Sequence, residues 1–169
     1  MASNSAKRDL QTVQLDPFDR KILERLQQNA AETYTELAGK IGLSPSPCLR
    51  RVHRLHEEGP IQRTVVLLDP QAIGLRLNIF TIISLERQNE ASLKVFEAAV
   101  ANLPEVVECY LITGSDADYL LHIVLPDLPS YRKFLLDHIT GIPGIARIRS
   151  SYALDQIKYT TSLPLKYAP

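Results

Sequence analysis

The stretch YTELAGKIGLSPSPCLRRVHRLHEEG, residues 34–59, combines two short apolar-periodic segments with a glycine between them. The spacing of its apolar residues predicts a first helix from Thr35 to Ile41 and a second helix that ends near His56. The turn between them falls on Gly42, Leu43 and Ser44. Two short helices joined by a glycine turn predict a helix-turn-helix.

The second of these helices has clear start and stop signals. Ser-Pro-Ser-Pro at residues 44–47 begins it, because a serine side chain caps free backbone N–H groups and proline fits the first helical turn. Either Ser44 or Ser46 can be the cap. Gly59 then suits the left-handed position that closes a helix.

On a helical wheel the second helix has one apolar and one cationic face. Between Ala38 and His56 there are four basic residues and no acidic ones. The apolar face, predicted to be buried, carries Cys48, Leu49, Val52 and Leu55, and the opposite face carries Ser46, Pro47, Arg50, His53 and Arg54, with Arg51 at its flank.

A cationic helix after a glycine turn has the geometry that enters a DNA major groove, where arginines bind guanine edges or phosphates. The alternative is a solvated basic face on an ordinary helical hairpin. The spacing, the small polar residues at the helix start and the one-sided charge together favour double-stranded DNA as the partner. The residues predicted to contact DNA are Thr35, Ser44, Pro45, Ser46, Pro47, Arg50, Arg51, His53 and Arg54.

Composition supports a globular chain of one or two small domains, with 169 residues, 45% hydrophobic and 22% charged. No run is long enough for a membrane span, and the polar start lacks a signal peptide, so we expect a cytoplasmic protein. Cys48 and Cys109 are predicted to be buried free thiols. The net charge is zero, with ten basic against eight acidic residues in 1–64, so firm DNA binding is expected to need more than one copy.

The first half of the chain divides into an arm, a domain and a linker. Residues 1–14 are predicted to be a flexible arm, and residues 15–68 a winged helix-turn-helix domain. Its first helix begins at the cap Asp16 and Pro17 and buries a stripe of apolar residues. Pro60 to Leu68 is predicted to be the strand of the wing, before a linker at residues 69–76. The buried stripe is Phe18, Ile22, Leu23 and Leu26.

The second half, residues 77–169, repeats one pattern of helix, apolar-Pro-x-apolar and strand. The order βαββαβ predicts an α+β, ferredoxin-like domain: an antiparallel sheet with both helices on one face. Apolar side chains on the other face would dimerise the chain. The predicted strands are 77–85, 106–113, 118–125 and 145–154, the helices lie around residues 93–103 and 131–139, and the proposed bare-face residues include Ile148, Tyr152 and Leu154.

Four segments together resemble the Lrp/AsnC (feast/famine, leucine-responsive) family of transcription regulators: LDPFDRKIL, LAGKIGLSPSPCLRRVHRLHEEG, LLDPQAIG and ITGSDADYLLHIVLPDLPSYRKF. The resemblance covers the chain from Leu15 to near Ile157. It implies a sequence-specific DNA-binding regulator with a C-terminal RAM/ACT-like ligand domain. It also implies homodimers that assemble into tetramers, octamers or larger rings, with an amino-acid effector bound at dimer–dimer contacts.

The family's ligand region corresponds here to the hairpin GSDADY, which is one residue longer than the common form. A carboxylate in this hairpin could hold an α-ammonium group, and an apolar wall would select the side chain of the effector. The alternative is that Asp116 and Asp118 only form the turn. The predicted effector residues are Gly114, Asp116, Asp118, Tyr119, Leu154 and Asp155.

Other functions have weaker support from the residues. The chain has no glycine-rich phosphate loop and no nucleophile elbow, and His53 with His56 lacks a third metal ligand, so neither an enzyme nor a metal site nor another cofactor is expected. A nucleoid-associated protein that compacts DNA with little sequence preference is the alternative. An amino-acid-sensing ferredoxin-like enzyme is a more remote one.

Overall fold

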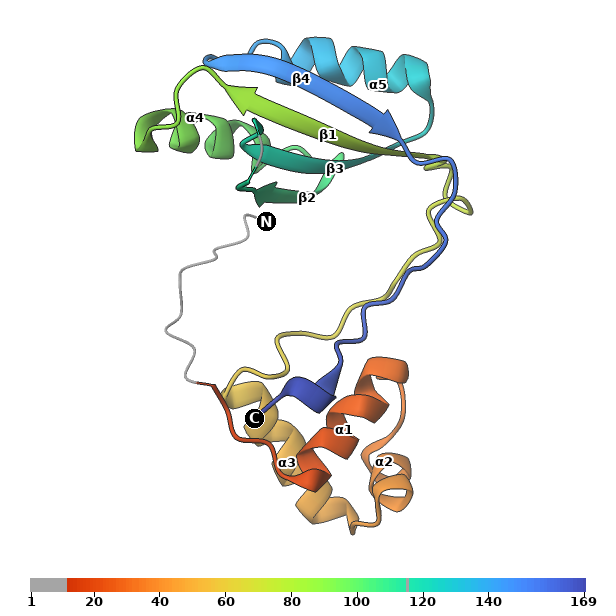
Figure 1. The fold of residues 1–169 in the computed structure, drawn as a ribbon. Helices are drawn as coiled ribbons and strands as arrows, with labels where there is room; N and C mark the ends of the chain where they lie inside the picture. Colours follow the sequence, from red (N-terminus) through yellow and green to blue (C-terminus); the bar gives the residue numbers. More distant parts are fainter. Residues whose placement is uncertain (1–11, 115) are drawn as a thin grey trace. The chain divides into compact units, whose positions relative to one another are not determined.

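The computed structural model describes residues 12–114 and 116–169 (Figure 1). These residues form two compact units. Of the described residues, the helix-turn-helix unit contains 12–67 together with Lys158–Pro169, and the sheet unit contains Leu68–Ile157. Most of the predicted arm, residues 1–14, lies outside the described residues. The described helices are all too short or too polar to cross a membrane.

Three helices form the helix-turn-helix unit: α1 (Pro17–Gln28), α2 (Tyr34–Ile41) and α3 (Pro45–Glu57). The predicted cap of α1 is confirmed, since the Asp16 side chain accepts hydrogen bonds from the backbone N–H groups of Phe18 and Asp19. A second capping box begins α2 at Thr33. Gly42 closes α2 with φ +80°, a conformation that L side chains rarely adopt.

Helix α3 begins where the sequence predicted but is capped differently. Ser44 occupies the cap position, yet its side chain makes no capping hydrogen bond. At the other end, Glu58 is the last cap residue and Gly59 follows it with φ +100°. The glycine therefore supplies the left-handed turn that lets the chain leave the helix.

The core of this unit is formed by the facing sides of the three helices. The predicted stripe on α1 is confirmed for Ile22 and Leu23 and for Leu26, which is half-buried and packs against the core. Phe18 lies outside this cluster, and the buried Asp19, which is 1% exposed, was not predicted. The carboxylate is retained in the interior by two arginines described below. The buried apolar residues are Ile22, Leu23, Leu37, Ala38, Ile41, Cys48, Val52 and Leu55.

The predicted wing is absent from the described residues, in which β1 (Leu77–Leu85) is the first strand. Residues 60–68 have the β-branched composition of a strand, but they pair with no other strand. Val66, in the middle of this segment, is 84% exposed. A single strand with unpaired backbone groups is not stable in water, so β-branched composition alone does not produce a wing.

The sheet unit has the predicted βαββαβ order (Figure 1). Its sheet is antiparallel with strand order β2-β3-β1-β4, so the first and third strands are central. The remaining elements are α4 (Glu90–Val100), β2 (Val106–Leu111), β3 (Tyr119–Leu125), α5 (Leu128–Phe134), the π-helical turn η1 (Leu135–Ile139) and β4 (Ile145–Tyr152).

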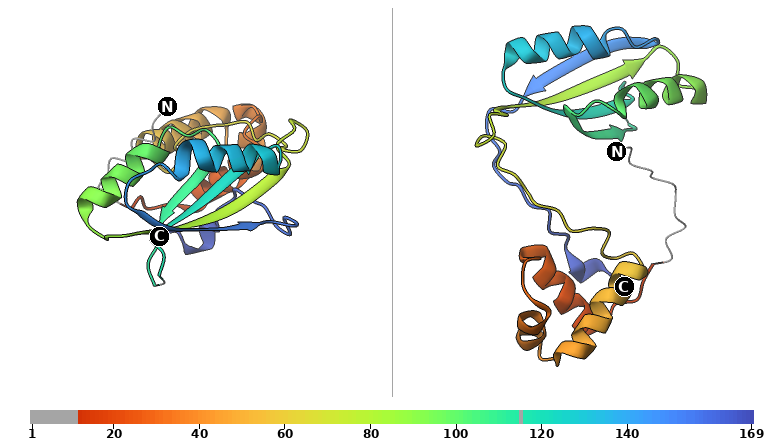
Figure 2. Two further views of the ribbon diagram at one scale, coloured as in Figure 1. Left: turned by 90° about the horizontal axis from the view of Figure 1, so that it is seen from above. Right: turned by 180° about the vertical axis from the view of Figure 1, so that it is seen from behind.

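Helices α4 and α5 cover the same face of this sheet (Figure 2). The core lies between these helices and the sheet. Alternation along β3 explains this arrangement, since every second residue from Tyr119 to Leu125 is buried. The core residues are Ile79, Ile83, Leu85, Phe96, Val100, Tyr119, Leu121, Ile123, Leu125, Tyr131, Phe134, Ile139 and Ile142.

The prediction for the bare face of the sheet is wrong in its residues. Ile148 pairs with Ile83 and packs against the core, and Tyr152 meets Tyr131 of α5 edge-on. Both residues therefore lie on the helix-covered face, and Leu154 lies beyond the strand. The uncovered face instead carries alternate residues of the opposite phase: Phe80, Ile82, Tyr110, Leu120, His122 and Val124.

Candidate functional sites

The cationic helix α3 has an exposed face that begins at its N-terminus. Ser44, Pro45, Ser46, Arg50 and His53 are exposed, and Pro47 is half-exposed. Arg50 makes no ion pair within the described residues. The exposed face thus offers hydroxyl groups at the first turn and a guanidinium one turn later, which are groups that bind phosphates and base edges. Thr35, at the start of α2, is also exposed.

Arg51 and Arg54 are partly exposed beside this face and are both paired with acidic residues of α1. Nη1 of Arg51 lies 2.8 Å from Oδ1 of Asp19 and 2.5 Å from Oδ2 of Asp16. Nη2 of Arg54 lies 2.5 Å from the other oxygen of Asp19. The two arginines therefore share a buried carboxylate and attach α3 to α1.

The charges in this cluster stabilise one another. Desolvation opposes the ionised form of Asp16, but hydrogen bonds from the backbone of Asp19 and from Arg51 lower its pKa overall. The hydrogen bond to Asp16 is the main cause of the raised pKa of Arg51, and the hydrogen bond to Asp19 is the main cause for Arg54. Both arginines are consequently held in the charged state while they position the helix.

Sequence reasoning missed Asp19 as a partner of these arginines. The signal was available in the spacing, since Asp16 and Asp19 are one helical turn apart and form a capping box. A further acidic residue, Glu32, forms two ion pairs through its Oε1 atom, with Nζ of Lys40 at 2.8 Å and with Nη2 of Arg25 at 2.5 Å. Three of the four basic residues between Ala38 and His56 are thus paired with acids outside that stretch.

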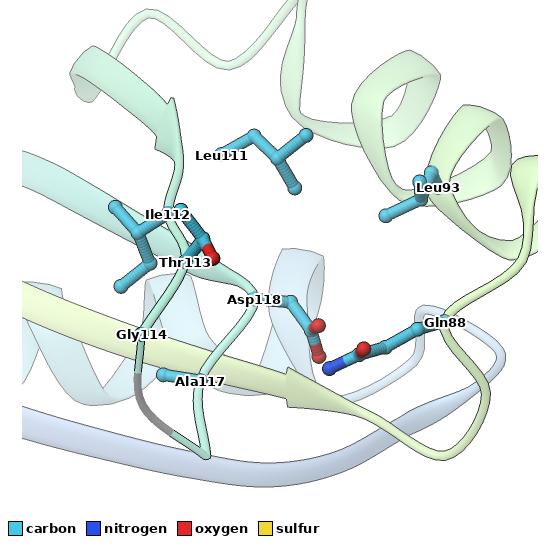
Figure 3. Close-up of a pocket in the computed structure, with 8 residues that line it drawn as sticks. All are labelled: Gln88, Leu93, Leu111, Ile112, Thr113, Gly114, Ala117 and Asp118. Atoms are coloured by element: carbon cyan, nitrogen blue, oxygen red, sulfur yellow. The ribbon is translucent and has the colours of Figure 1, made fainter.

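The predicted effector hairpin connects β2 to β3 and borders a pocket of about 320 Å³ (Figure 3). Gly114 lines the pocket and has φ +95°. The chain reverses here through a left-handed conformation that favours glycine. Apolar side chains from α4 and β2, Leu93 and Leu111, face the opening (Figure 3). The complete lining is Gln88, Leu93, Leu111, Ile112, Thr113, Gly114, Ala117 and Asp118.

Asp118 is both part of this pocket and part of the fold. Its side chain is 5% exposed, and Oδ2 accepts a hydrogen bond of 2.6 Å from the backbone N–H of Leu85. Its own backbone N–H donates to Ile83. The Asp118 carboxylate and the Gln88 carboxamide point toward one another across the pocket (Figure 3). One carboxylate can therefore fix the end of β1 and still present negative charge to a ligand.

Asp116, also predicted to bind the effector, is paired with two arginines of β4. Its exposed carboxylate accepts hydrogen bonds from Nη1 of Arg147 at 2.8 Å and from Nη2 of Arg149 at 3.1 Å. The charge of Arg149 is the main cause of the lowered pKa of Asp116. The turn is thus attached to β4 by ion pairs that compete with any ammonium ligand.

Tyr119 belongs to the core and does not line the pocket. It is 1% exposed, and its hydroxyl donates to Oε1 of Glu97 at 2.9 Å. Burial is the main cause of the raised pKa of this hydroxyl. The Tyr119 ring packs on Phe96, with ring centroids 4.4 Å apart, and so helps to hold α4 against the sheet.

Leu154 and Asp155 lie at the far end of the sheet from this pocket. Ala153 is bonded to Asn78 at the start of β1, whereas Asp118 is bonded to Ile83 near the end of β1. Five residues of strand separate these points by roughly 17 Å. One copy of the chain therefore does not bring Leu154 and Asp155 into its own pocket, and their part in effector binding stays a prediction for an assembly of several copies.

The sequence prediction also missed most of the pocket wall. Gln88 and Leu93 come from a different segment than the hairpin, and periodicity marked Leu93 only as a helix-core residue. Cys109 was predicted to be buried but is exposed on β2, which is an edge strand. Cys48 is buried as predicted, and burial raises the pKa of its thiol.

Comparisons with known proteins agree with this geometry. Residues 15–56 match the model of the AsnC-type helix-turn-helix domain, and residues 78–163 match that of the Lrp/AsnC ligand binding domain. The chain is 40% identical to the Bkd operon transcriptional regulator of Pseudomonas aeruginosa, covering 90% of this chain and 99% of that protein. It is 38% identical to the leucine-responsive regulatory protein of Escherichia coli, covering 90% and 92%.

Solved structures show the same relationship. An AsnC family transcriptional regulator from Agrobacterium tumefaciens superposes with a TM-score of 0.86 at 42% identity, covering 90% of this chain and 99% of that one. A transcriptional regulator from Neisseria meningitidis, solved as a complex with L-Met, gives 0.87 at 39% identity, covering 91% and 99%.

A helix-turn-helix unit joined to a ligand-binding α+β unit defines a transcription regulator and not an enzyme. The chain belongs to the Lrp/AsnC family.

Proposed function

We propose that this regulator binds specific DNA sequences through the exposed face of α3 and that an amino acid modulates its binding. The proposal of DNA binding rests on the arrangement of side chains around α3. One face of the helix is buried, Arg51 and Arg54 are paired with Asp19, and the exposed face carries Arg50 and His53. A helix positioned in this way presents a rigid set of donors to a major groove.

Footprinting on the DNA upstream of the protein's own coding sequence tests this proposal. We expect discrete protected half-sites that repeat with the helical period, with affinity that falls as salt rises. Uniform protection without phasing would support the nucleoid-associated, compacting alternative instead. The zero net charge of the chain favours specific binding, since long-range attraction to any DNA is weak.

The effector part of the proposal depends on the pocket beside the hairpin. A volume of about 320 Å³, a carboxylate at Asp118 and an apolar wall of Leu93 and Leu111 suit the ammonium group and side chain of an aliphatic amino acid. The relative solved with L-Met supports this class of ligand. Thermal-shift measurements with each of the twenty amino acids, followed by DNA binding for any that stabilise, identify the effector.

We also propose that the uncovered sheet face joins two copies into a dimer. Phe80 is 39% exposed and stacks on His122, with ring centroids 4.7 Å apart, and Ile82 and Leu120 lie beside them in register. Apolar surface of this kind contributes about 25 cal/mol per Å² when it is covered. Dimers would then assemble into tetramers, octamers or larger rings, in which Leu154 and Asp155 of another copy could reach the pocket.

In this proposal the effector acts on the contact between dimers near the hairpin. A ligand bound there changes the spacing of the dimers, and the many weak DNA contacts act together only when that spacing fits. By linkage, DNA must change the affinity for the effector by the same factor. We place the protein in the cytoplasm, associated with the nucleoid, because that is where its DNA partner lies.

A further inference from the structure

The segment Lys158–Pro169, here called the return segment, packs against α1 in the helix-turn-helix unit. It was predicted to be part of the ligand domain. Its chain runs antiparallel to the helix, from Gln27 near the helix end to Leu15 before the helix start. A 3-10 turn, η2 (Leu165–Tyr167), lies between these points. The contact therefore extends along the length of α1.

The hydrogen bonds of this contact use the backbone of the return segment. The Gln27 carboxamide donates to the carbonyl of Leu163 at 3.2 Å and accepts from its N–H at 2.6 Å. Nη1 of Arg20 donates to the carbonyls of Leu165 and Ala168, each at 2.9 Å. Two side chains seven residues apart on α1 thus bind the backbone of the return segment before its 3-10 turn and at that turn.

One side chain of the return segment anchors the contact. Leu165 packs, half-buried, against the apolar core shared by the three helices. Beside it, Leu163 and Thr161 form one wall of a groove whose other walls include Leu23 and Val52. A leucine in an apolar site, with its flanking backbone bonded on both sides, is a general arrangement for peptide recognition.

We infer that the outer face of α1 is a peptide-binding surface, that its ligand is the return segment, and that this docking completes the DNA-binding unit. The three helices of this unit are short, and a unit of this size buries little surface by itself. The docked segment covers apolar residues of α1 and α3 that would otherwise face water. Because the chain enters the sheet unit after Leu67 and leaves it after Ile157, the ligand unit is attached to the DNA-binding unit by two chain crossings.

Deletion of residues 161–169 from the full chain tests the inference by hydrogen exchange. We expect amide exchange to rise at least tenfold in α1 and α3 and to stay unchanged in α4 and β3. A synthetic peptide of residues 161–169, added in trans at about millimolar concentration, should restore protection, because it replaces a tethered ligand. The same peptide with Leu165 replaced by Asp should not.

A matched pair of point variants separates docking from a general effect of truncation. Arg20→Ala loses both carbonyl contacts and should raise exchange at α1, whereas Glu24→Ala, exposed on the same helix, should not. Unchanged protection in the truncated chain, or peptide rescue that does not depend on Leu165, would overturn the inference. DNA binding measured on the intact chain is independent of this result, so failure of the proposed function is seen separately.

Discussion

Oδ2 of Asp19, on α1, lies 2.5 Å from Nη2 of Arg54, on α3, and the other oxygen of the same carboxylate accepts Arg51 at 2.8 Å. The aspartate is 1% exposed, while the two arginine side chains are 29% and 39% exposed. One buried charge is therefore neutralised by two cations at the surface. This arrangement fixes the rotation of α3 about its axis, and so decides which of its side chains reach DNA.

Asp19→Asn tests that role. The amide cannot accept from both guanidinium groups, so we expect a loss of about 2 kcal/mol in the free energy of unfolding of the helix-turn-helix unit. Urea denaturation monitored at α3 measures the loss. Glu24→Gln, an exposed change on the same helix, is the control and should stay within about 0.5 kcal/mol of the parent. Equal stability of the two variants would mean that the cluster does not hold α3.

Arg50→Ala and Arg54→Ala should differ in kind. Arg50 has no ion pair among the described residues, so its loss should weaken DNA binding by at least about 1 kcal/mol with stability unchanged. Arg54→Ala should lower DNA affinity by a similar amount and also destabilise the unit, because Asp19 loses a partner. Gel shifts and denaturation of both variants decide the matter, and the oligomer should remain intact in each. If the Arg50 variant binds DNA with the affinity of the parent, α3 is not part of the DNA interface.

Asp118→Asn should abolish the response to the amino-acid effector. The amide oxygen can still accept from the N–H of Leu85, so the fold is kept, while the charge that would hold an ammonium group is lost. We expect effector affinity to fall at least tenfold, or about 1.4 kcal/mol, with DNA binding retained. Calorimetry with the effector measures this, and Asp116→Asn serves as the control. A retained response would place the pocket elsewhere.

Acid should destabilise the helix-turn-helix unit through Asp16. The folded-state pKa of Asp16 lies below its ordinary value of 3.8. Its carboxylate therefore contributes stability above that pH, and the contribution is lost as the pH falls through the lowered pKa. In Asp16→Asn the acid limb of the stability curve should flatten for this unit. Asp127→Asn, at the start of α5, should change the acid limb of the sheet unit instead.

Ile82→Asp should dissociate the proposed dimer. Ile82 lies on the uncovered sheet face beside Leu120 and opposite Arg149, whose guanidinium is already paired with Asp116, so a carboxylate at position 82 would be desolvated when two faces meet. Sedimentation at micromolar concentration should show monomers for this variant and dimers for the parent. Leu136→Asp, exposed on the far side of the sheet unit's helices, should not change the mass. A parent chain that sediments as a monomer would end the dimer proposal.

Local signals determined a large part of this fold before any coordinates. Caps and glycines marked the start of α1, the end of α2 and both ends of α3 to within about one residue, because helix ends depend on a few neighbouring backbone groups. The repeated pattern of helix, apolar-Pro-x-apolar and strand indicated the ferredoxin-like order. The exposed positions of Arg50 and His53 also followed from the helical period alone.

Partners between distant segments were decided by the tertiary structure. The sequence placed Ile148 on the bare sheet face, which was wrong because sheet register depends on residues far along the chain. It placed Arg54 on the outer face without its ion pair to Asp19, because that pair depends on how α1 and α3 pack. The predicted wing was lost for a related reason, since a strand forms only where a second strand meets it. Sequence determined which elements form, and the packing of those elements determined which side chains remain available for DNA and effector.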